Sequence, residues 1–128
     1  MILVDSDIVI EVIRARDPGI GEMWKDLSDA AEIVTYSPVT VAEVWHGARA
    51  NEHEDLTRLF RALLCLPIDQ EIGRLAGGYL AKYHRSHSLE LGDALIAATA
   101  VVHAAELWTR NRKHFPMKEI SFFHGLPR

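Results

Sequence analysis

Three acidic residues stand in separate parts of the chain, each at a place where a carboxylate could face a ligand. Asp5 follows a short apolar run, Glu43 lies in the middle third, and Asp93 lies in the apolar segment 91–102. Three carboxylates from separated segments could meet only at a cation, because without one they would repel and at least one would hold its proton. Oxygen ligands alone favour Mg²⁺ or Mn²⁺ over zinc. Such a site activates water and shields phosphate charge, which is phosphodiester hydrolysis if the substrate is a nucleic acid.

Two of these acids also have a purely structural interpretation. Ser6 or Asp7 could cap the helix that follows Asp5, and Asp7 can do so while Asp5 binds a metal. Glu43 fits a capping box that starts at Thr40, although the same placement also suits a metal ligand at a helix start. Both interpretations remain open from the sequence alone.

Asp93 is the most informative of the three acids. The segment around it is apolar on nearly every face, so we expect a buried helix. An ionised carboxylate there costs several kcal/mol, as an order of magnitude, unless it is paired or bound to metal. The helix dipole would favour an acid in the first turn. Because Ser88 is the predicted N-cap, Asp93 would lie about a turn further in, where that effect is weaker.

The segments that must position these acids alternate between strand and helix. Period and turn residues predict strands at 2–4, 33–36, 65–68, 106–109 and 120–123, and helices at 8–13, 20–31, 40–50, 55–64, 70–84 and 89–104. This alternation predicts a three-layer α/β/α sandwich with a mostly parallel central sheet. Ligands bind at the carboxyl ends of such strands, which favours Asp5 and residues 109–111 as site residues.

Composition is typical of one globular domain over residues 1–128, since 48% of the residues are hydrophobic, 25% are charged and no repeat or linker is visible. No apolar run approaches the length of a membrane span, and the start MILVDSD does not resemble a signal peptide. Cys65 is the only cysteine, so no internal disulfide or cysteine-based zinc site can form. We therefore expect a cytoplasmic protein.

The net charge of −4 argues against a protein that binds nucleic acid through overall positive charge. The charge is uneven, however, because Arg110, Arg112, Lys113 and His114 cluster near the C-terminus. This run is either a solvated loop or, at a strand end beside the expected crevice, a contact to RNA phosphates. We expect the two arginines and the lysine to make that contact.

Four segments resemble, in order, the motifs of the PIN domain family. They are Ile2 to Asp7, Thr40 to Val44, Gly92 to Ala100, and Trp108 to Phe115. The segment from Gly92 is the most specific match, and together they cover the chain from end to end. Short members of this family are mostly toxins of the VapC type.

The resemblance implies an α/β/α metal-dependent ribonuclease that acts as a toxin, is restrained by a cognate antitoxin protein and commonly forms a homodimer. By position, Asp5, Glu43 and Asp93 would be the catalytic residues and the ligands of Mg²⁺ or Mn²⁺. The supporting residues would be Ser6, Asp7, Thr109 and Asn111.

The fourth segment departs from the family pattern. Family members often carry an acid at or near the positions of Asn111 and His114, and neither residue is acidic here. Loss of a negative ligand should weaken a second cation site, because two clustered cations need compensating charge. We therefore expect one well-bound cation at Asp5 and Asp93, with Glu43 acting directly or through water.

Three other classes remain as alternatives. The Asp5/Asp7 pair resembles the nucleophile motif of haloacid-dehalogenase-like phosphatases, but no later lysine with an acidic pair completes that site. A receiver-like signalling domain has a similar length, but it would need an aspartate after a middle strand, where Ser37 stands. A catalytically silent PIN fold that only binds a partner is the third.

The histidines and tryptophans contribute little to the prediction of function. The four histidines that could suggest metal or acid–base chemistry lack a ligand pattern, and we expect mostly surface or capping roles for His46, His84, His87 and His103. Trp24 and Trp45 lie on apolar helical stripes, which indicates core packing or a contact under an antitoxin or dimer partner.

Overall fold

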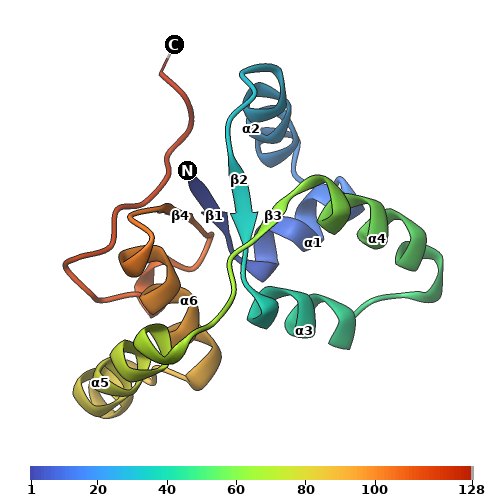
Figure 1. Ribbon diagram of the computed structural model, residues 1–128. Coiled ribbons are helices and arrows are strands. Elements are labelled where there is room, and N and C mark those ends of the chain that lie inside the picture. The colour runs from blue at the N-terminus through green and yellow to red at the C-terminus, as the bar shows by residue number, and fades with distance from the viewer. Residues whose placement is uncertain (128) are drawn as a thin grey trace.

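The central sheet has four parallel strands. The computed structural model describes residues 1–127, and its strand order is β3-β2-β1-β4. The strands are β1 (Ile2–Val4), β2 (Val34–Tyr36), β3 (Leu64–Cys65) and β4 (Glu106–Trp108). β1 pairs with β2 and with β4, so its three buried residues form the centre of the sheet (Figure 1).

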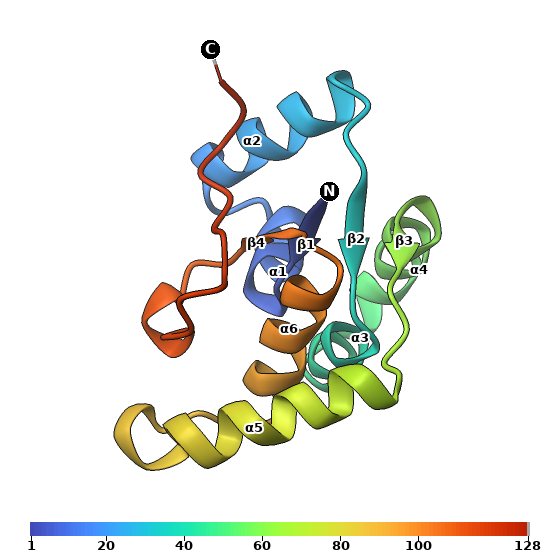
Figure 2. The same ribbon diagram turned by 60° about the vertical axis from the view of Figure 1, so that its left-hand side comes forward.

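Within residues 1–127, six helices surround this sheet: α1 (Ser6–Arg14), α2 (Pro18–Asp29), α3 (Pro38–His46), α4 (His53–Ala62), α5 (Gln70–His87) and α6 (Leu91–Val102). Short 3-10 turns span Ala50–Glu52 and Arg112–His114. Figure 2 shows α5 and α6 apart from α2 and α4, with the strands between them. No helix within residues 1–127 is both long and apolar enough to cross a membrane.

Successive residues of β1 point to opposite faces and belong to two separate cores. Leu3 packs with the core of α5 and α6, whereas Ile2 and Val4 pack with the core of α1, α2 and α4. The three β1 side chains are at most 3% exposed. Because β1 is buried on both faces, all of its residues are hydrophobic. The predicted three-layer sandwich is confirmed.

The capping box at Thr40, one of the two interpretations left open for Glu43, does not form in the structure. α3 begins at Pro38, and the N-cap is Ser37, whose hydroxyl oxygen accepts a hydrogen bond from Val39 N at 3.1 Å. Serine at the N-cap with proline at the first helical position starts the helix three residues earlier than the Thr40 box requires. Thr40 is buried instead, and its hydroxyl donates to Val4 O at 3.5 Å. Glu43 therefore does not cap α3.

The predicted N-cap at Ser88 is also wrong. α5 continues to His87 and ends at Ser88, which adopts the left-handed conformation with φ 51°. α6 begins at Leu91, so Asp93 lies in its first turn. The side chain of Asp93 is consequently only half-buried, at 23% exposed, and not deep in the core as expected. An acid in the first turn is favoured by the helix dipole.

The strands predicted at 65–68 and 120–123 are much shorter in the structure. The strand expected at 65–68 is Leu64–Cys65, because Pro67 cannot donate to a ladder. The strand expected at 120–123 reduces to one parallel bridge between Leu107 and Phe122. The sheet therefore ends at β4, and the C-terminal segment runs on beside α2 (Figure 2).

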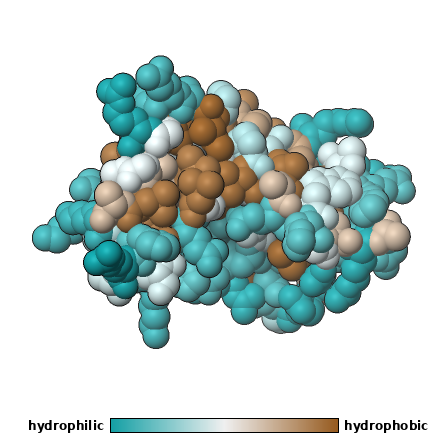
Figure 3. Space-filling model, turned by 90° about the horizontal axis from the view of Figure 1, so that it is seen from below, coloured by the Kyte–Doolittle hydropathy of each residue, from teal (hydrophilic) through white to brown (hydrophobic). Residues whose placement is uncertain are grey.

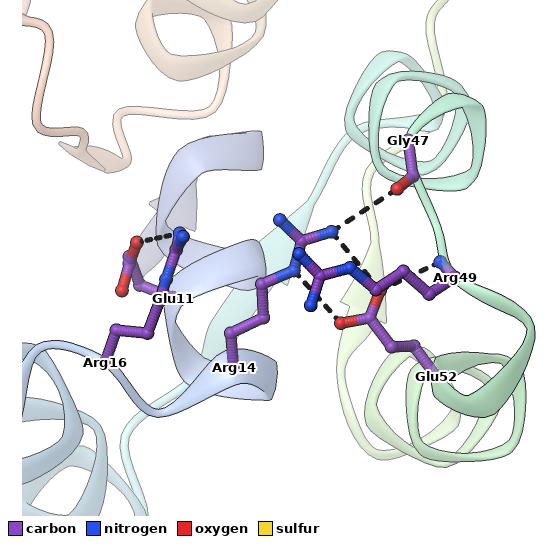
Figure 4. A network of polar contacts seen from close by, with 6 residues as sticks. All are labelled: Glu11, Arg14, Arg16, Gly47, Arg49 and Glu52. Carbon is purple, nitrogen blue, oxygen red and sulfur yellow. Dashed lines mark hydrogen bonds and ion pairs between the residues drawn. The ribbon is translucent and has the colours of Figure 1, made fainter.

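An ion pair fastens the end of α1 to the turn after α3. Arg14 Nε donates to Glu52 Oε2 at 3.0 Å, and Arg14 Nη2 donates to Gly47 O at 3.3 Å (Figure 4). Arg49 N donates to the other oxygen of Glu52 at 2.9 Å. The hydrogen bond from Arg14, followed by the one from Arg49 N, lowers the pKa of Glu52 to about 2. The contact joins two helices that both carry site residues.

We predict that Glu52→Gln lowers the Tm at neutral pH and that this loss disappears in acid. The pKa of Glu52 falls from 4.5 to about 2 on folding, so its stabilisation is complete above pH 4.5 and is lost as the pH falls towards 2. Circular dichroism melts of both proteins between pH 2 and 7 measure this window. Glu54→Gln is the control, because Glu54 and its partner Arg58 are both highly exposed. A Tm loss that stays constant with pH would contradict the prediction.

Candidate active site

Asp5 is fixed by the pairing of β1 with β4. Val4 pairs with Trp108, so Asp5 and Thr109 leave the sheet side by side at its carboxyl edge. Thr109 Oγ1 donates to Asp5 Oδ2 at 2.8 Å, and Ser6 N donates to Asp5 Oδ1 at 2.8 Å. Asp5 is thus the N-cap of α1, the role that we had considered for Ser6 or Asp7, and it is only 6% exposed. The carboxylate cannot rotate away from the sheet edge.

Glu43 and Asp93 come from two helices that meet above this edge. Ser6, at the start of α1, lies beside the Glu43 carboxylate and opposes the rise in its pKa. On α6, a Cβ added at Gly92 would lie 3.4 Å from both Glu43 Oε2 and Val39 Cγ1. α6 therefore packs directly against α3 at Gly92, and both acids face one space.

One crevice of about 370 Å³ contains the three predicted ligands. It lies at the carboxyl ends of the strands, the end toward which the β2 arrow points in Figure 1. Of the predicted site residues, the crevice is lined by Asp5, Ser6, Glu43, Asp93 and Asn111. The remaining predicted residues, Asp7, Thr109, Arg110, Arg112 and Lys113, lie outside the lining of this crevice.

The crevice is electrostatically unfavourable for its own acids. Burial raises the pKa of Asp5, and hydrogen bonds from Thr109 and Ser6 only partly oppose this. Burial, followed by the charge of Asp5, raises the pKa of both Glu43 and Asp93. The charge of Asp5 therefore makes Glu43 and Asp93 harder to ionise. A group that carries positive charge into the crevice would relieve this repulsion.

The donor chemistry fits a hard divalent cation. Carboxylate and amide oxygens line the crevice, as Mg²⁺ and Mn²⁺ prefer. Within residues 1–127, no three side chains of the types His, Cys, Asp and Glu already lie close enough to share one ion. The three acids therefore face one crevice without forming a preassembled set of ligands, and a bound cation would have to bring them closer together.

Asp7 holds the loop after β4 and does not line the crevice. Its Oδ2 accepts hydrogen bonds from Arg110 N at 2.9 Å and from Asn111 Nδ2 at 3.3 Å. Its Oδ1 is buried and has no hydrogen-bond partner within residues 1–127. Burial, followed by the charge of Asp5, raises the pKa of Asp7 to about 6. The loop that carries Asn111 is therefore tied to the first turn of α1.

Glu11 is a buried acid whose link to the loop after β4 is not apparent from the sequence. Its side chain is only 7% exposed, and its Oε1 pairs with Arg110 Nη1 at 3.1 Å and with Arg16 (Figure 4 shows the Arg16 pair). Its Oε2 is buried without a hydrogen-bond partner within residues 1–127. The available signal was an acid four residues after Asp7 in an otherwise apolar helix, which places both on one face.

We predict that Glu11→Gln lowers the affinity for RNA more than it lowers the rate of cleavage. Without the charge, Arg110 loses the ion pair that orders its side chain, so we expect KM to rise by a few fold. Steady-state cleavage of a labelled RNA separates KM from kcat. Arg16→Ala is the matched control, because it removes the other partner of Glu11 and leaves Arg110 paired. A larger fall in kcat than rise in KM would show that Glu11 acts on the chemistry.

Four further residues line the crevice. Three of them were not predicted as site residues, and the sequence analysis names the fourth only because family members often carry an acid there. The three are His87, Ser88 and Glu90, and the fourth is His114. Glu90 adds to the negative field at Asp93, whereas His114, 3.9 Å from the Asp93 carboxylate, opposes it. The signal for Glu90 was an acid three residues before Asp93 at the same helix end. His87 is a surface residue, as predicted, and it also lines the crevice.

The fold and the site together define a class: an α/β/α sandwich with an acidic crevice at the carboxyl ends of its parallel strands. The sequence model of the PIN domain matches residues 2–120. The chain is 40% identical to ribonuclease VapC10 of Mycobacterium tuberculosis over 93% of this chain and 89% of the relative. It is 32% identical to ribonuclease VapC19 of the same species over 91% of this chain and 94% of that one. The chain belongs to the PIN domain family.

Solved structures agree with this assignment. The FitAcB structure from Neisseria gonorrhoeae has a TM-score of 0.74 and 27% identity, with 97% of each chain covered. VapBC2 from Rickettsia felis, bound to a promoter DNA fragment, has a TM-score of 0.79, covers 96% of this chain and 98% of that one, and shares the fold at 18% identity.

Proposed function

We propose that the protein is a metal-dependent endoribonuclease and the toxin component of a toxin–antitoxin pair. The observation that carries this proposal is the meeting of Asp5, Glu43 and Asp93 in one crevice at the carboxyl ends of the strands. The names of the VapC10 and VapC19 relatives, both ribonucleases, support RNA as the substrate.

Each crevice residue has a distinct role in this proposal. Asp5 and Asp93 hold Mg²⁺ or Mn²⁺, and Glu43 binds the ion directly or through a water molecule. The bound ion would activate a water molecule and shield phosphate charge during in-line displacement. Thr109 and Ser6 keep the Asp5 carboxylate oriented through their hydrogen bonds. Asn111 offers an amide to the substrate or to a bound water molecule.

We expect a single cation, because Asn111 and His114 stand where family members often carry an acid. Two cations would need more negative charge than Asp5, Glu43 and Asp93 supply, unless Glu90 contributes. Crystals soaked in Mn²⁺ and measured for anomalous scattering count the ions. Two fully occupied sites in wild-type crystals, reduced to one in Glu90→Gln crystals, would show that Glu90 replaces the missing acid.

The partners in this proposal are RNA, a cognate antitoxin protein and a second copy of the chain in a homodimer. The VapBC and FitAB structures support the antitoxin. A hydrophobic area on the face seen from below in Figure 3 supports a protein contact, and Leu91 at the start of α6 is 61% exposed. The pair would act in the cytoplasm, where RNA is accessible.

Incubation of purified protein with total RNA and a set of tRNAs tests the proposal. Discrete cleavage is expected with Mg²⁺ or Mn²⁺ and none with EDTA. The non-acidic Asn111 and His114 favour one second candidate, a catalytically silent PIN fold that only binds a partner. Absence of cleavage from folded, antitoxin-free protein under every metal condition would select it.

A further inference from the structure

A histidine faces the acidic crevice from the loop after β4. The Nδ1 atom of His114 lies 3.9 Å from Asp93 Oδ2, and both residues line the crevice. This separation is too long for a hydrogen bond, which needs about 2.7–3.2 Å between the two heavy atoms. The two groups therefore face each other without bonding directly, and the contact leaves room for an ion between them.

The spacing of these two atoms suits two ligands of one metal ion. Donors that lie about 2.1 Å from a common ion are about 3.0 Å apart at right angles and about 4.2 Å apart when they are opposite. The 3.9 Å between His114 Nδ1 and Asp93 Oδ2 falls within this range. Within residues 1–127, no three side chains of ligand type are close enough to share an ion, but this pair already has the required spacing.

His114 also lies near Asp5, the other proposed carboxylate ligand. Burial raises the pKa of Asp5 and of Asp93, and His114 is among the groups that oppose this rise at each of them. All three side chains line the same crevice. The His114 ring is therefore placed to join both acids around one ion.

The backbone at His114 is held in place, whereas its ring has space to move. His114 N donates to Asn111 O at 3.0 Å, and the next residue, Phe115, is buried in the core of α5 and α6. The His114 side chain is 59% exposed. It also lines a larger pocket of about 820 Å³, formed by the first half of α2, the loop after β4 and the C-terminal segment. The ring can thus make the short movement that binding a metal requires.

His87 also lines the crevice, but its contacts lie elsewhere. Its Nδ1 is hydrogen-bonded to Ser86 Oγ at 2.7 Å, and its ring meets the Tyr83 ring edge-on, with the ring centres 5.7 Å apart. These contacts hold His87 against the end of α5. His114, which contacts an acid of the site, is the better candidate for a metal ligand, and His87 is a suitable control.

We propose that His114 binds the crevice cation through a ring nitrogen, beside Asp5 and Asp93, and makes the site prefer transition metals such as Mn²⁺ and Co²⁺ over Mg²⁺. The inference rests on the cation site of the proposed function and adds a nitrogen ligand to it. Imidazole nitrogen binds first-row transition metals with an affinity that rises from Mn²⁺ to Co²⁺. Mg²⁺ takes oxygen ligands and keeps several of its water molecules.

Pulsed electron paramagnetic resonance of the Mn²⁺-loaded protein tests the ligand directly. An imidazole bound to Mn²⁺ gives a nitrogen coupling that carboxylate ligands cannot give. We expect this coupling in the wild-type protein and in His87→Ala, and we expect it to vanish in His114→Ala. Its absence from the wild-type spectrum, or its persistence in His114→Ala, would overturn the proposal.

Isothermal titration calorimetry with Mg²⁺, Mn²⁺ and Co²⁺ measures the preference. His114→Ala should lower the affinity for Co²⁺ by about tenfold or more, since loss of even an outer-shell partner of a ligand costs about 10–100-fold. The affinity for Mg²⁺ should change by less than about threefold, because a water molecule can replace the ring on that ion. His114→Asp, which offers oxygen in place of nitrogen, should raise the affinity for Mg²⁺ and lower the ratio of Co²⁺ to Mg²⁺ affinity.

The rival explanation is that His114 is only a cationic neighbour of Asp93. In that case His114→Ala should strengthen the binding of all three ions equally, because it removes a positive charge from the crevice and no ligand from the ion. That result would overturn the proposal. The His114 side chain is mostly exposed, so both His114 variants should fold, and circular dichroism checks this.

The nitrogen ligand and the proposed ribonuclease fail in different ways. Metal-dependent RNA cleavage without a nitrogen coupling from His114 would retain the ribonuclease and reject the ligand. A nitrogen coupling that His114→Ala removes, without any RNA cleavage, would support the ligand in a silent PIN fold.

Discussion

Asp93→Asn is expected to lower RNA cleavage by more than about a hundredfold. Loss of an outer-shell partner of a metal ligand already costs 10–100-fold in metal affinity or activity, and Asp93 is a proposed direct ligand. Asparagine has nearly the same shape, so α6 should still begin at Leu91 and Gly92 should still pack against Glu43. The loss of activity would therefore reflect the missing charge of Asp93 and not a change in packing.

Initial cleavage rates at saturating Mg²⁺ and Mn²⁺ measure this effect. Asp29→Asn is a matched control, because it is the same chemical change at an exposed position at the end of α2. It should cleave at the wild-type rate. Activity of Asp93→Asn within a few fold of wild type, with an intact fold, would exclude Asp93 as a ligand and leave Asp5 without its partner.

The second large effect concerns stability and not rate. Divalent metal should raise the Tm of the wild-type protein by roughly 10 °C when its concentration is 100 times Kd. Binding to the folded state alone contributes about 2.7 kcal/mol under that condition, and each kcal/mol shifts the Tm of a domain of this size by about 4 °C. The physical cause is that the cation compensates the charge of three carboxylates whose pKa values are raised by burial and, for Glu43 and Asp93, also by the charge of Asp5.

Asp93→Asn should change both the Tm without metal and the rise in Tm that metal causes. In EDTA it should melt above the wild-type protein, because one of the mutually repelling carboxylates has become neutral. On addition of metal it should gain little. Differential scanning calorimetry with and without metal, beside Asp29→Asn, measures both shifts. A wild-type Tm that does not respond to Mg²⁺ or Mn²⁺ at any concentration would argue against a cation at this crevice.

The layers of the fold could be predicted because the hydrophobic pattern is strong where the chain is buried on both sides. β1 and α6 are nearly continuous apolar segments, and both are central in the structure. The helix starts could not be placed as well. Ser37-Pro38 and Thr40 are both acceptable starts by local chemistry, and only the position of the buried Thr40 against β1 decides between them.

The candidate site was partly predictable for a related reason. Asp5 and Asp93 stand out because they are acids in apolar surroundings, and the four motifs link them to Glu43. Glu11 was overlooked because its partner, Arg110, lies 99 positions away, and no local pattern predicts that pairing. The pocket beside the crevice needs the C-terminal segment to return to α2, which is a purely tertiary feature.

The hydrogen bond between Thr109 and Asp5 has a consequence for the synthesis of the protein. It joins residues 104 positions apart, and β4 is the last strand to leave the ribosome. A nascent chain that already displays Asp5, Glu43 and Asp93 still lacks the neighbour that orients Asp5, as well as the loop that Asp7 and Glu11 hold. Contacts this distant in sequence form late. The crevice would thus be completed only after β4 and the loop that follows it have been synthesised, which delays any activity until that point.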